Sequence, residues 1–320
     1  MVRQFIDPEL RSAVEQRPSF DIWADIATTR MLYQQGMLAK AQHVPLLEHV
    51  PYTDHLIPSC DDDAQVRVRV YQPEDLDSPR PAMLWIHGGG YVLGSIDIEV
   101  PMMQRLASAA GCTIVAVEYR LAPEHPFPTP LNDCYAALSW MFQQASQLQI
   151  DPQRIAIAGI SAGGGLAAAL ALMARERGEF KPLFQLLLCP MLDDRNQQPS
   201  THFELQGISW SREDNRSGWE AYLGGQFSES LPSYAVPARA PDLSALPPTY
   251  IAVGGLDLFL DEDLAYARRL MEAQVSTELH VFPGAFHGFE FIAPEARVSK
   301  RAHHLMSDIL RHAFNQVQCN

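Results

Sequence analysis

The stretch Gly159-Ile160-Ser161-Ala162-Gly163 stands between an apolar run and a helix-forming segment. Residues 154–158, just before it, have the short and apolar character of a buried strand. More glycines and the alanine- and leucine-rich residues 166–174 follow it. A serine with glycines two residues before and after it predicts a tight, strained turn, because bulkier residues at the glycine positions would clash. Such a turn between strand and helix lifts the serine Oγ above the sheet as a candidate nucleophile.

Short apolar runs recur along the chain and predict one mostly parallel sheet. They occupy residues 82–86, 113–117, 155–158, 184–188, 249–253 and 278–282. Helical stretches separate most of them, and this alternation is typical of an α/β protein whose sheet is covered on both faces. Residues 66–70 differ, because valine and arginine alternate there, and we expect a half-exposed antiparallel edge strand.

Two stretches fall outside this alternation, and we interpret them as a cap over Ser161. Residues 1–45 show a patchy helical stripe between 8 and 40. Residues 191–246 have no strand pattern but carry several aromatic residues and a helical segment at 209–223. Long insertions in compact domains are usually functional. The expected division is therefore cap helices at 1–45, a catalytic α/β domain at 46–190 and 247–320, and a cap insertion at 191–246.

Charge and composition argue against several classes of partner. The 320 residues include 24 Lys and Arg against 38 Asp and Glu, a net charge of −14, so we expect no nucleic-acid partner. No apolar run approaches the roughly 20 residues that span a bilayer, so no membrane insertion is expected. The N-terminus has no apolar signal segment, and five widely spaced cysteines favour reduced thiols. We predict a cytoplasmic location.

A base and an acid that suit Ser161 follow later strands. An acyl-transfer serine needs a base, a group that orients the base, and donors for the oxyanion. Asp257 is the first acid after the run 249–253, and His287 lies in a glycine-flanked loop after the last run. Asp261 is the alternative acid, although it has the character of the first turn of the next helix.

The oxyanion donors are expected from His87-Gly88-Gly89-Gly90, directly after the run 82–86. Consecutive glycines let backbone N–H groups point into a cavity without obstruction by Cβ atoms. We expect Gly89 and Gly90 to donate, together with the N–H of Ala162 beside the nucleophile. A P-loop and a dinucleotide fingerprint are both missing, so no cofactor is expected.

One pattern near the C-terminus could ligate a metal. His304, Asp308 and His312 are spaced to share one face of a helix, and zinc accepts such ligands. A polar outer face opposite the apolar residues of the same helix is the simpler interpretation. We therefore expect no metal site.

Taken in chain order, these motifs resemble the hormone-sensitive-lipase family of serine esterases, which has the α/β-hydrolase fold. The resemblance extends from about residue 66 to the C-terminus. It rests on His87-Gly-Gly-Gly90, Tyr119-Arg-Leu-Ala-Pro-Glu124 with His125-Pro-Phe-Pro128, Gly159-Ile-Ser-Ala-Gly-Gly164, Asp257 and His287-Gly-Phe289. Within the family the chain is most similar to bacterial carboxylesterases, including the heroin-esterase type. Ile160 departs from the family, which commonly has a polar residue there; this concerns hydrogen bonding near the turn rather than the reaction class.

The resemblance implies an eight-stranded, mostly parallel sheet with helices on both faces and a helical cap. It implies a triad and an oxyanion hole made of Ser161 as nucleophile, Asp257 as acid, His287 as base, and Gly89, Gly90 and Ala162 as donors. It also implies a carboxylesterase acting on a small-molecule ester. Because a cap bounds the pocket, we expect esters of short to medium chain length. An exposed last strand and helix would permit a homodimer.

Two other functions remain open. The same triad serves amidases, lactonases and deacetylases, so another acyl bond is the nearer alternative. A non-catalytic ligand-binding protein is the other, since plant gibberellin receptors share this fold; those receptors have lost the catalytic histidine, whereas His287 is present here.

Overall fold

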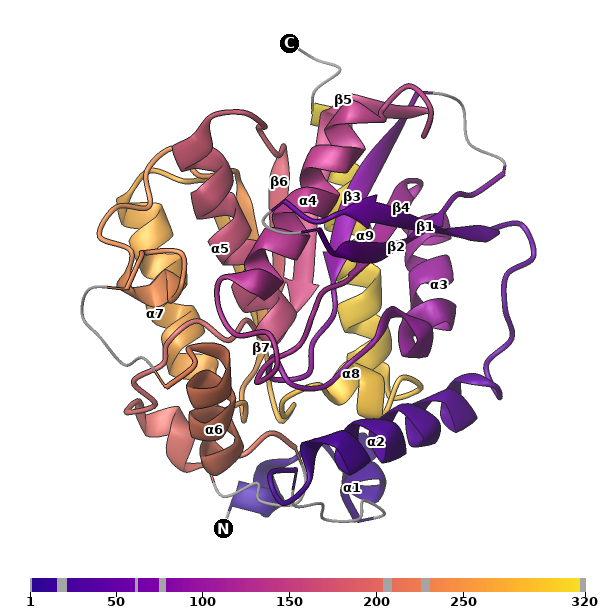
Figure 1. The fold of residues 1–320 in the computed structure, drawn as a ribbon. Helices are drawn as coiled ribbons and strands as arrows, with labels where there is room; N and C mark the ends of the chain where they lie inside the picture. The colour runs from indigo at the N-terminus through magenta and orange to yellow at the C-terminus, as the bar shows by residue number, and fades with distance from the viewer. Residues whose placement is uncertain are drawn as a thin grey trace.

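The computed structural model describes residues 2–15, 22–60, 63–74, 79–203, 209–225 and 231–316. Within these residues, eight strands form one sheet in the order β1-β2-β4-β3-β5-β6-β7-β8 (Figure 1). The expected fold class is confirmed. The strands are β1 (Tyr52–Pro58), β2 (Gln65–Tyr71), β3 (Arg80–Ile86), β4 (Thr113–Glu118), β5 (Ile150–Ile160), β6 (Phe184–Leu188), β7 (Thr249–Gly254) and β8 (Thr277–Phe282).

The sheet is parallel from β4 to β8 and antiparallel at its other end. β2 pairs antiparallel with both β1 and β4, and the remaining neighbours pair parallel. The residues of β6 and β7 are buried throughout, which explains why these strands read as continuous apolar runs.

Helices cover both faces of the sheet (Figure 1). One apolar cluster joins the sheet to α4 (Thr129–Gln143), α5 (Ala162–Arg177) and α7 (Leu260–Glu272). A second cluster joins the opposite face to α3 (Val100–Ala110) and α9 (Arg297–Gln316). No helix in the described ranges is long and apolar enough to cross a membrane.

The expectation of an edge strand at residues 66–70 is wrong. β2 lies between β1 and β4, and it is β1, exposed at most of its positions, that forms the edge. The arginines of β2 can lie inside the sheet because they form ion pairs with carboxylates of other segments. Arg69 is 6 % exposed and lies 2.6 Å from a carboxylate oxygen of Asp54 and 2.9 Å from one of Asp97. An alternation of apolar and basic residues therefore marks an ion-paired interior strand here.

The helices expected at the N-terminus and in the long insertion are present. They are α1 (Pro8–Glu15), α2 (Ile26–Ala41) and α6 (Arg212–Tyr222). All three lie in the lower part of Figure 1, as does the short helix α8 (Phe289–Ile292) that follows β8. A capping box begins α6, in which Ser211 Oγ accepts from Asp214 N and the Asp214 carboxylate accepts from Ser211 N. Parts of the insertion, 204–208 and 226–230, lie outside the described residues.

Glu99 is a carboxyl group buried in the interior just before α3. It is 6 % exposed, and Trp85 Nε1 donates a hydrogen bond to its Oε2 at 2.7 Å. Burial raises the pKa of Glu99 from 4.5 to about 8. The unfolded chain loses this proton near the ordinary pKa, whereas the folded chain keeps it to a higher pH. The stability it contributes is therefore complete below about pH 4.5 and is lost as the pH rises through about 8.

We expect Glu99→Gln to remove this pH dependence, because glutamine is neutral and keeps the acceptor for Trp85. The free energy of unfolding of the variant, relative to the wild type, should rise between about pH 5 and pH 9 by a few kcal/mol. Urea unfolding at several pH values measures this difference. Glu220→Gln, at an exposed position on α6, is the control. A relative stability of Glu99→Gln that does not change with pH would contradict the expectation.

Candidate active site

Ser161 sits on the turn between β5 and α5 in a strained backbone conformation. Its φ is 56° and its ψ −122°, in a region that L-residues rarely adopt. A Cβ atom at Gly159 would collide with the carbonyl oxygen of Gly163, and one at Gly163 would collide with that of Ile86. The two flanking glycines are therefore required by the close approach of three backbone segments, as the sequence pattern predicts.

The structure brings Ser161, His287 and Asp257 into one hydrogen-bonded line. His287 Nε2 lies 2.9 Å from Ser161 Oγ, and His287 Nδ1 lies 2.9 Å from Asp257 Oδ2. Phe259 N donates to Asp257 Oδ1 at 3.0 Å. Asp257 is fully buried, while Ser161 and His287 are 7 % and 9 % exposed. The alternative acid, Asp261, lies elsewhere and accepts a hydrogen bond from Ser200 N.

The glycine loop after β3 lies against this turn. A Cβ at Gly88 would be 3.0 Å from the Ile160 carbonyl oxygen and 3.3 Å from Ser161 Cβ. Gly89 and Gly90 have φ angles of 126° and 60°, which glycine adopts without strain. Among the described residues, no backbone hydrogen bond involves the N–H groups of Gly89, Gly90 or Ala162. These three N–H groups therefore have no backbone acceptor among the described residues.

Tyr119 packs against the residue that begins the same glycine loop. Its ring stacks on His87 at a centroid distance of 4.2 Å, and its hydroxyl donates to the His87 carbonyl oxygen at 3.0 Å. His87 is buried, and burial lowers its pKa. The imidazole is therefore a neutral packing group that fixes the start of the glycine loop.

Residues of the long insertion reach the site. Trp210 lies directly over Gly90, where a Cβ atom would collide with its ring. Ser209 Oγ donates to the backbone oxygen of His287 at 2.6 Å. Trp23 Nε1, from the N-terminal segment, donates to Asp214 Oδ1 at 2.9 Å. The N-terminal segment, the insertion and the loops around Ser161 thus contact one another.

Two buried side chains lie near Asp257 and His287, a position that was not expected from the sequence, although burial of the Cys189 thiol was. Cys189, just after β6, has its Sγ within 4.8 Å of ligand atoms of both Asp257 and His287. Glu290 is 6 % exposed, and its Oε2 has no hydrogen-bond partner within the described residues. Burial raises the pKa of Glu290 to about 7. The sequence held one signal for Cys189. It directly follows a strand, as Ser161 and Asp257 do, and the carboxyl ends of neighbouring parallel strands lie at one edge of the sheet.

The three residues of α9 considered as metal ligands are His304, Asp308 and His312. Within the described ranges, His304, Asp308 and His312 do not bring their ligand atoms together. Asp308 instead pairs with Arg311 at 3.2 Å, and His312 Nε2 lies 2.7 Å from Gln316 Nε2.

Comparisons with known proteins agree with this geometry. Residues 83–291 match the family described as the alpha/beta hydrolase fold. The chain belongs to this family. It is 38 % identical to carboxylesterase NlhH of Mycobacterium tuberculosis, over 72 % of this chain and 74 % of that protein. It is 33 % identical to ethyl acetate hydrolase of Pseudomonas putida, over 87 % of both chains.

The solved structure of a bacterial heroin esterase superposes on this α/β hydrolase with a TM-score of 0.92. The two chains are 39 % identical, and the match covers 98 % of this chain and 99 % of that one. The resemblance to the hormone-sensitive-lipase branch, noted from the sequence motifs, is thereby confirmed.

We expect Gly163→Ala to destabilise the protein, because its Cβ would collide with the carbonyl oxygens of both Ile86 and His87. The loss should be about 1–3 kcal/mol or more in the free energy of unfolding, measured in urea. Gly36→Ala is the matched control, since a Cβ there meets nothing within 4 Å. Gly36 lies inside α2, where alanine should stabilise by about 0.5–1 kcal/mol. Equal stabilities of the two variants would refute the argument from close approach.

Proposed function

We propose that this protein is a serine carboxylesterase that cleaves short- to medium-chain carboxylic esters through an acyl-enzyme on Ser161. The observation that carries the proposal is the hydrogen-bonded line of Ser161, His287 and Asp257 at a strained turn. A serine on such a turn, next to a histidine and a buried carboxylate, has the parts of an acyl-transfer enzyme. The names of the relatives, a carboxylesterase and an ethyl acetate hydrolase, support the same class.

Acylation begins when His287 Nε2 takes the proton of Ser161 Oγ, which lies 2.9 Å away. The oxygen attacks the ester carbonyl carbon, and the carbonyl oxygen becomes an oxyanion. The N–H groups of Gly89, Gly90 and Ala162 stabilise this charge. His287 then gives its proton to the departing alcohol oxygen, and the ester C–O bond breaks. Asp257 keeps the imidazole oriented and stabilises its protonated form.

Deacylation repeats these steps with water. His287 accepts a proton from water, whose oxygen attacks the acyl carbon, and the bond to Ser161 Oγ breaks as the serine recovers its proton. The carboxylic acid product leaves. The burial of the triad keeps these charges in a medium where fixed donors act more strongly than in bulk water.

We assign residues 1–45 and 191–246 to a cap over the catalytic domain, which comprises 46–190 and 247–320. The contacts of Trp23 with Asp214, of Trp210 with Gly90 and of Ser209 with the His287 backbone support this assignment. A cap that lies directly on the oxyanion loop bounds the space for the acyl chain. This is why we propose small, soluble esters as substrates in preference to long-chain lipid.

Hydrolysis of p-nitrophenyl esters from acetate to palmitate tests the proposal. We expect turnover to be greatest with short acyl chains and to fall by several orders of magnitude in Ser161→Ala. Ser146→Ala, an exposed serine, is the matched control and should keep its turnover. Near-normal turnover by Ser161→Ala would contradict the assignment of Ser161 as the nucleophile.

The same assay with anilides, lactones and N-acetyl substrates separates the alternative acyl bonds. Higher kcat/KM for one of these than for any ester, with the same dependence on Ser161, would move the assignment to an amidase, lactonase or deacetylase. Wild-type protein inactive on every class would favour a ligand-binding role.

Trp210 should limit the length of the acyl chain, because its ring lies against Gly90. We expect Trp210→Ala to raise the ratio of kcat/KM for octanoate to that for butyrate by about tenfold, the effect of roughly two buried methylene groups. Trp140→Ala, on α4 and in contact with His55, is the control for loss of a tryptophan elsewhere. A ratio that changes equally in both variants would contradict this role.

Two further expectations remain proposals. A cytoplasmic location follows from sequence composition alone. A homodimer is permitted by β8, which is an edge strand and carries Val281 with 37 % of its surface exposed.

A further inference from the structure

Helix α2 of the N-terminal segment reaches the loops beside the active site through one side chain, Arg30. None of the residues of α2 is itself buried. The Nε of Arg30 donates to the backbone oxygen of Val92 at 2.6 Å, and its Nη2 donates to that of Ala122 at 2.5 Å. Both Nη atoms also donate to the Glu124 carboxylate, each at 2.8 Å. One guanidinium group therefore joins α2 to two separate loops.

The first of these loops continues the glycine loop that carries the proposed oxyanion donors. The N–H groups of Val92 and Leu93 donate to the backbone oxygen of Gly89, at 3.1 and 2.8 Å. These bonds close residues 89–93 into a tight turn, in which a Cβ at Gly89 would collide with the Leu93 carbonyl oxygen. Arg30 contacts the 89–93 turn at the Val92 carbonyl oxygen. The direction of the N–H groups at the start of the turn therefore depends on how the whole turn is held.

The second loop supports the same turn. Ala122 N donates to the Tyr91 backbone oxygen at 3.0 Å, while the Ala122 oxygen accepts from Arg30. Val92 and Ala122 are fully buried, and no backbone N–H of the described residues donates to either of their carbonyl oxygens. A buried carbonyl oxygen without a donor is unfavourable. The Arg30 guanidinium is thus the donor that satisfies both loops.

An apolar contact joins the same segments. Val92, Leu93 and Ala122 form a small buried cluster of their own, apart from the two that cover the sheet. The side chains that pack against it come from the N-terminal segment and from α6: Ile22, Trp23, Tyr33 and Ala221. Both polar and apolar contacts of the N-terminal segment therefore meet at the 89–93 turn.

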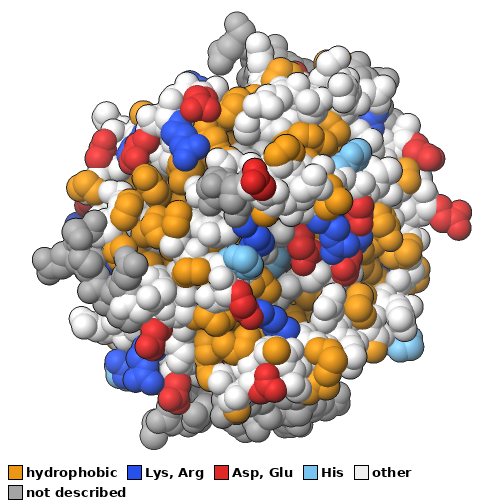
Figure 2. Space-filling view, viewed as in Figure 1, with side chains coloured by type: hydrophobic (Ala, Val, Ile, Leu, Met, Phe, Trp, Pro, Cys, Tyr) orange, Lys and Arg blue, Asp and Glu red, His pale blue; other side chains and the backbone are white. Residues whose placement is uncertain are grey.

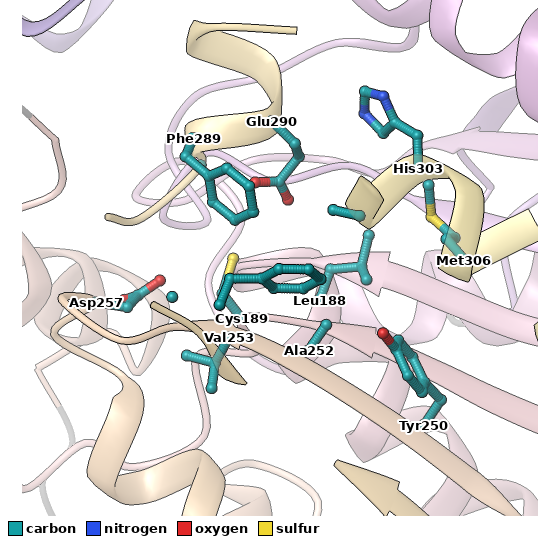
Figure 3. Close-up of a pocket in the computed structure, with 14 residues that line it drawn as sticks. Leu188, Cys189, Tyr250, Ala252, Val253, Asp257, Phe289, Glu290, His303 and Met306 are labelled. Atoms are coloured by element: carbon teal, nitrogen blue, oxygen red, sulfur yellow. The ribbon is translucent and has the colours of Figure 1, made fainter. Parts of the chain in front are cut away.

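The two sides of the proposed active site are supported differently. Behind Asp257, the cavity drawn in Figure 3 has a volume of only ≈ 20 Å³ and a mostly apolar lining, so side-chain packing supports the acid. Beside the 89–93 turn lies a larger cavity of ≈ 240 Å³, lined by Arg30 and Tyr33 of α2 and by Gly94 and Ser95 of the loop. The loop therefore has room to move on this side once Arg30 no longer holds it.

The charge of Arg30 is balanced locally. Figure 2 shows that basic and acidic side chains stand beside one another over the middle of this face, without a patch of one sign. Glu124, the partner of Arg30, has 54 % of its side chain exposed. Because exposed ion pairs contribute little to stability, we expect the two carbonyl contacts to matter more than this pair.

We propose that Arg30 is a positioning residue for the oxyanion hole, so that the docking of α2 sets the rate of catalysis. The guanidinium holds the 89–93 turn, and the turn directs the N–H groups of Gly89 and Gly90. Arginine suits this role because its planar fork donates in several directions at once, whereas lysine offers a single point charge. The inference rests on the proposed esterase function, since these donors serve the oxyanion of an ester.

The kinetics of Arg30→Lys test the proposal. Lysine keeps the charge but lacks the fork that reaches both carbonyl oxygens. We expect kcat for p-nitrophenyl butyrate to fall about tenfold and KM to change less than about twofold, because the oxyanion exists only in the transition state. Glu124→Gln removes the ion pair and leaves the carbonyl contacts, so it should lower kcat by less than about twofold. Arg268→Lys, at an exposed position on α7, is the control.

A transition-state analogue gives a readout that a loss of stability does not change. Ser161 Oγ adds to the carbonyl carbon of an alkyl trifluoromethyl ketone, and the carbonyl oxygen becomes an oxyanion in the hole. The inhibition constant of this ketone should weaken in Arg30→Lys by the same factor as kcat/KM falls. An unchanged inhibition constant, or a change in KM alone, would overturn the positioning role. An equal loss of kcat in Glu124→Gln would assign the effect to the ion pair and overturn it as well.

Hydrogen–deuterium exchange separates this inference from the esterase function, because it needs no turnover. The amides of Val92 and Leu93 should exchange about tenfold faster in the Ser161→Ala, Arg30→Lys double variant than in Ser161→Ala. Peptides from β6, which is buried throughout, should keep their protection. Unchanged exchange at 89–93 would overturn the inference. Faster exchange there, in a protein whose wild type is inactive on every acyl substrate, would uphold the hold of Arg30 on the turn and reject the esterase.

Discussion

The active site depends on the close approach of three backbone segments at the carboxyl end of β5. Gly163, in the first turn of α5, lies against the carbonyl oxygens of Ile86 and His87 at the end of β3. Gly159 lies against the carbonyl oxygen of Gly163. Only residues without a Cβ allow this, and the resulting turn forces Ser161 to a φ of 56°. The strain is held because β5 is hydrogen-bonded to β3 on one side and β6 on the other. One steric constraint thus places the serine beside both the glycine loop and the ends of β6 and β7.

Several buried acidic side chains, among them Asp257, Glu262 and Asp263, follow the ends of β6 and β7. Glu262 accepts hydrogen bonds from the backbone N–H groups of Leu192 and Asp193, while Asp263 has no partner for either oxygen among the described residues. Burial raises the pKa of Glu262 and Asp263 well above the ordinary values. Asp257 differs from them because Phe259 N and His287 each face one of its oxygens. Contact with the His287 imidazole, rather than burial or backbone hydrogen bonds, therefore distinguishes Asp257 from Glu262 and Asp263.

Much of the fold was predictable, because buried parallel strands leave continuous apolar runs in the sequence. Ser161 and His287 were predictable for a related reason. The glycines on either side of Ser161 and next to His287 indicate tight turns, and a tight turn is a local feature of the sequence. β1 was missed because most of its side chains are exposed and its polar residues resemble a loop. The burial of β2 was missed because it depends on carboxylates from other segments, such as Asp54 and Asp97.

Cys189, Ser209 and Glu290 were not predicted to lie beside His287. Cys189 and Ser209 reach it only after segments distant in the sequence have folded together, although the place of Cys189 directly after a strand was a signal. Glu290 is only three residues beyond His287 along the chain. His287 is the point where these segments meet. Its ring contacts Ser161 and Asp257 and meets the Phe259 ring edge-on at 5.0 Å, while its backbone oxygen accepts from Ser209. In the proposed mechanism, a His287 ring held from so many sides is well oriented to act as the base, and a disturbance in the insertion or at Asp257 reaches the reaction through it.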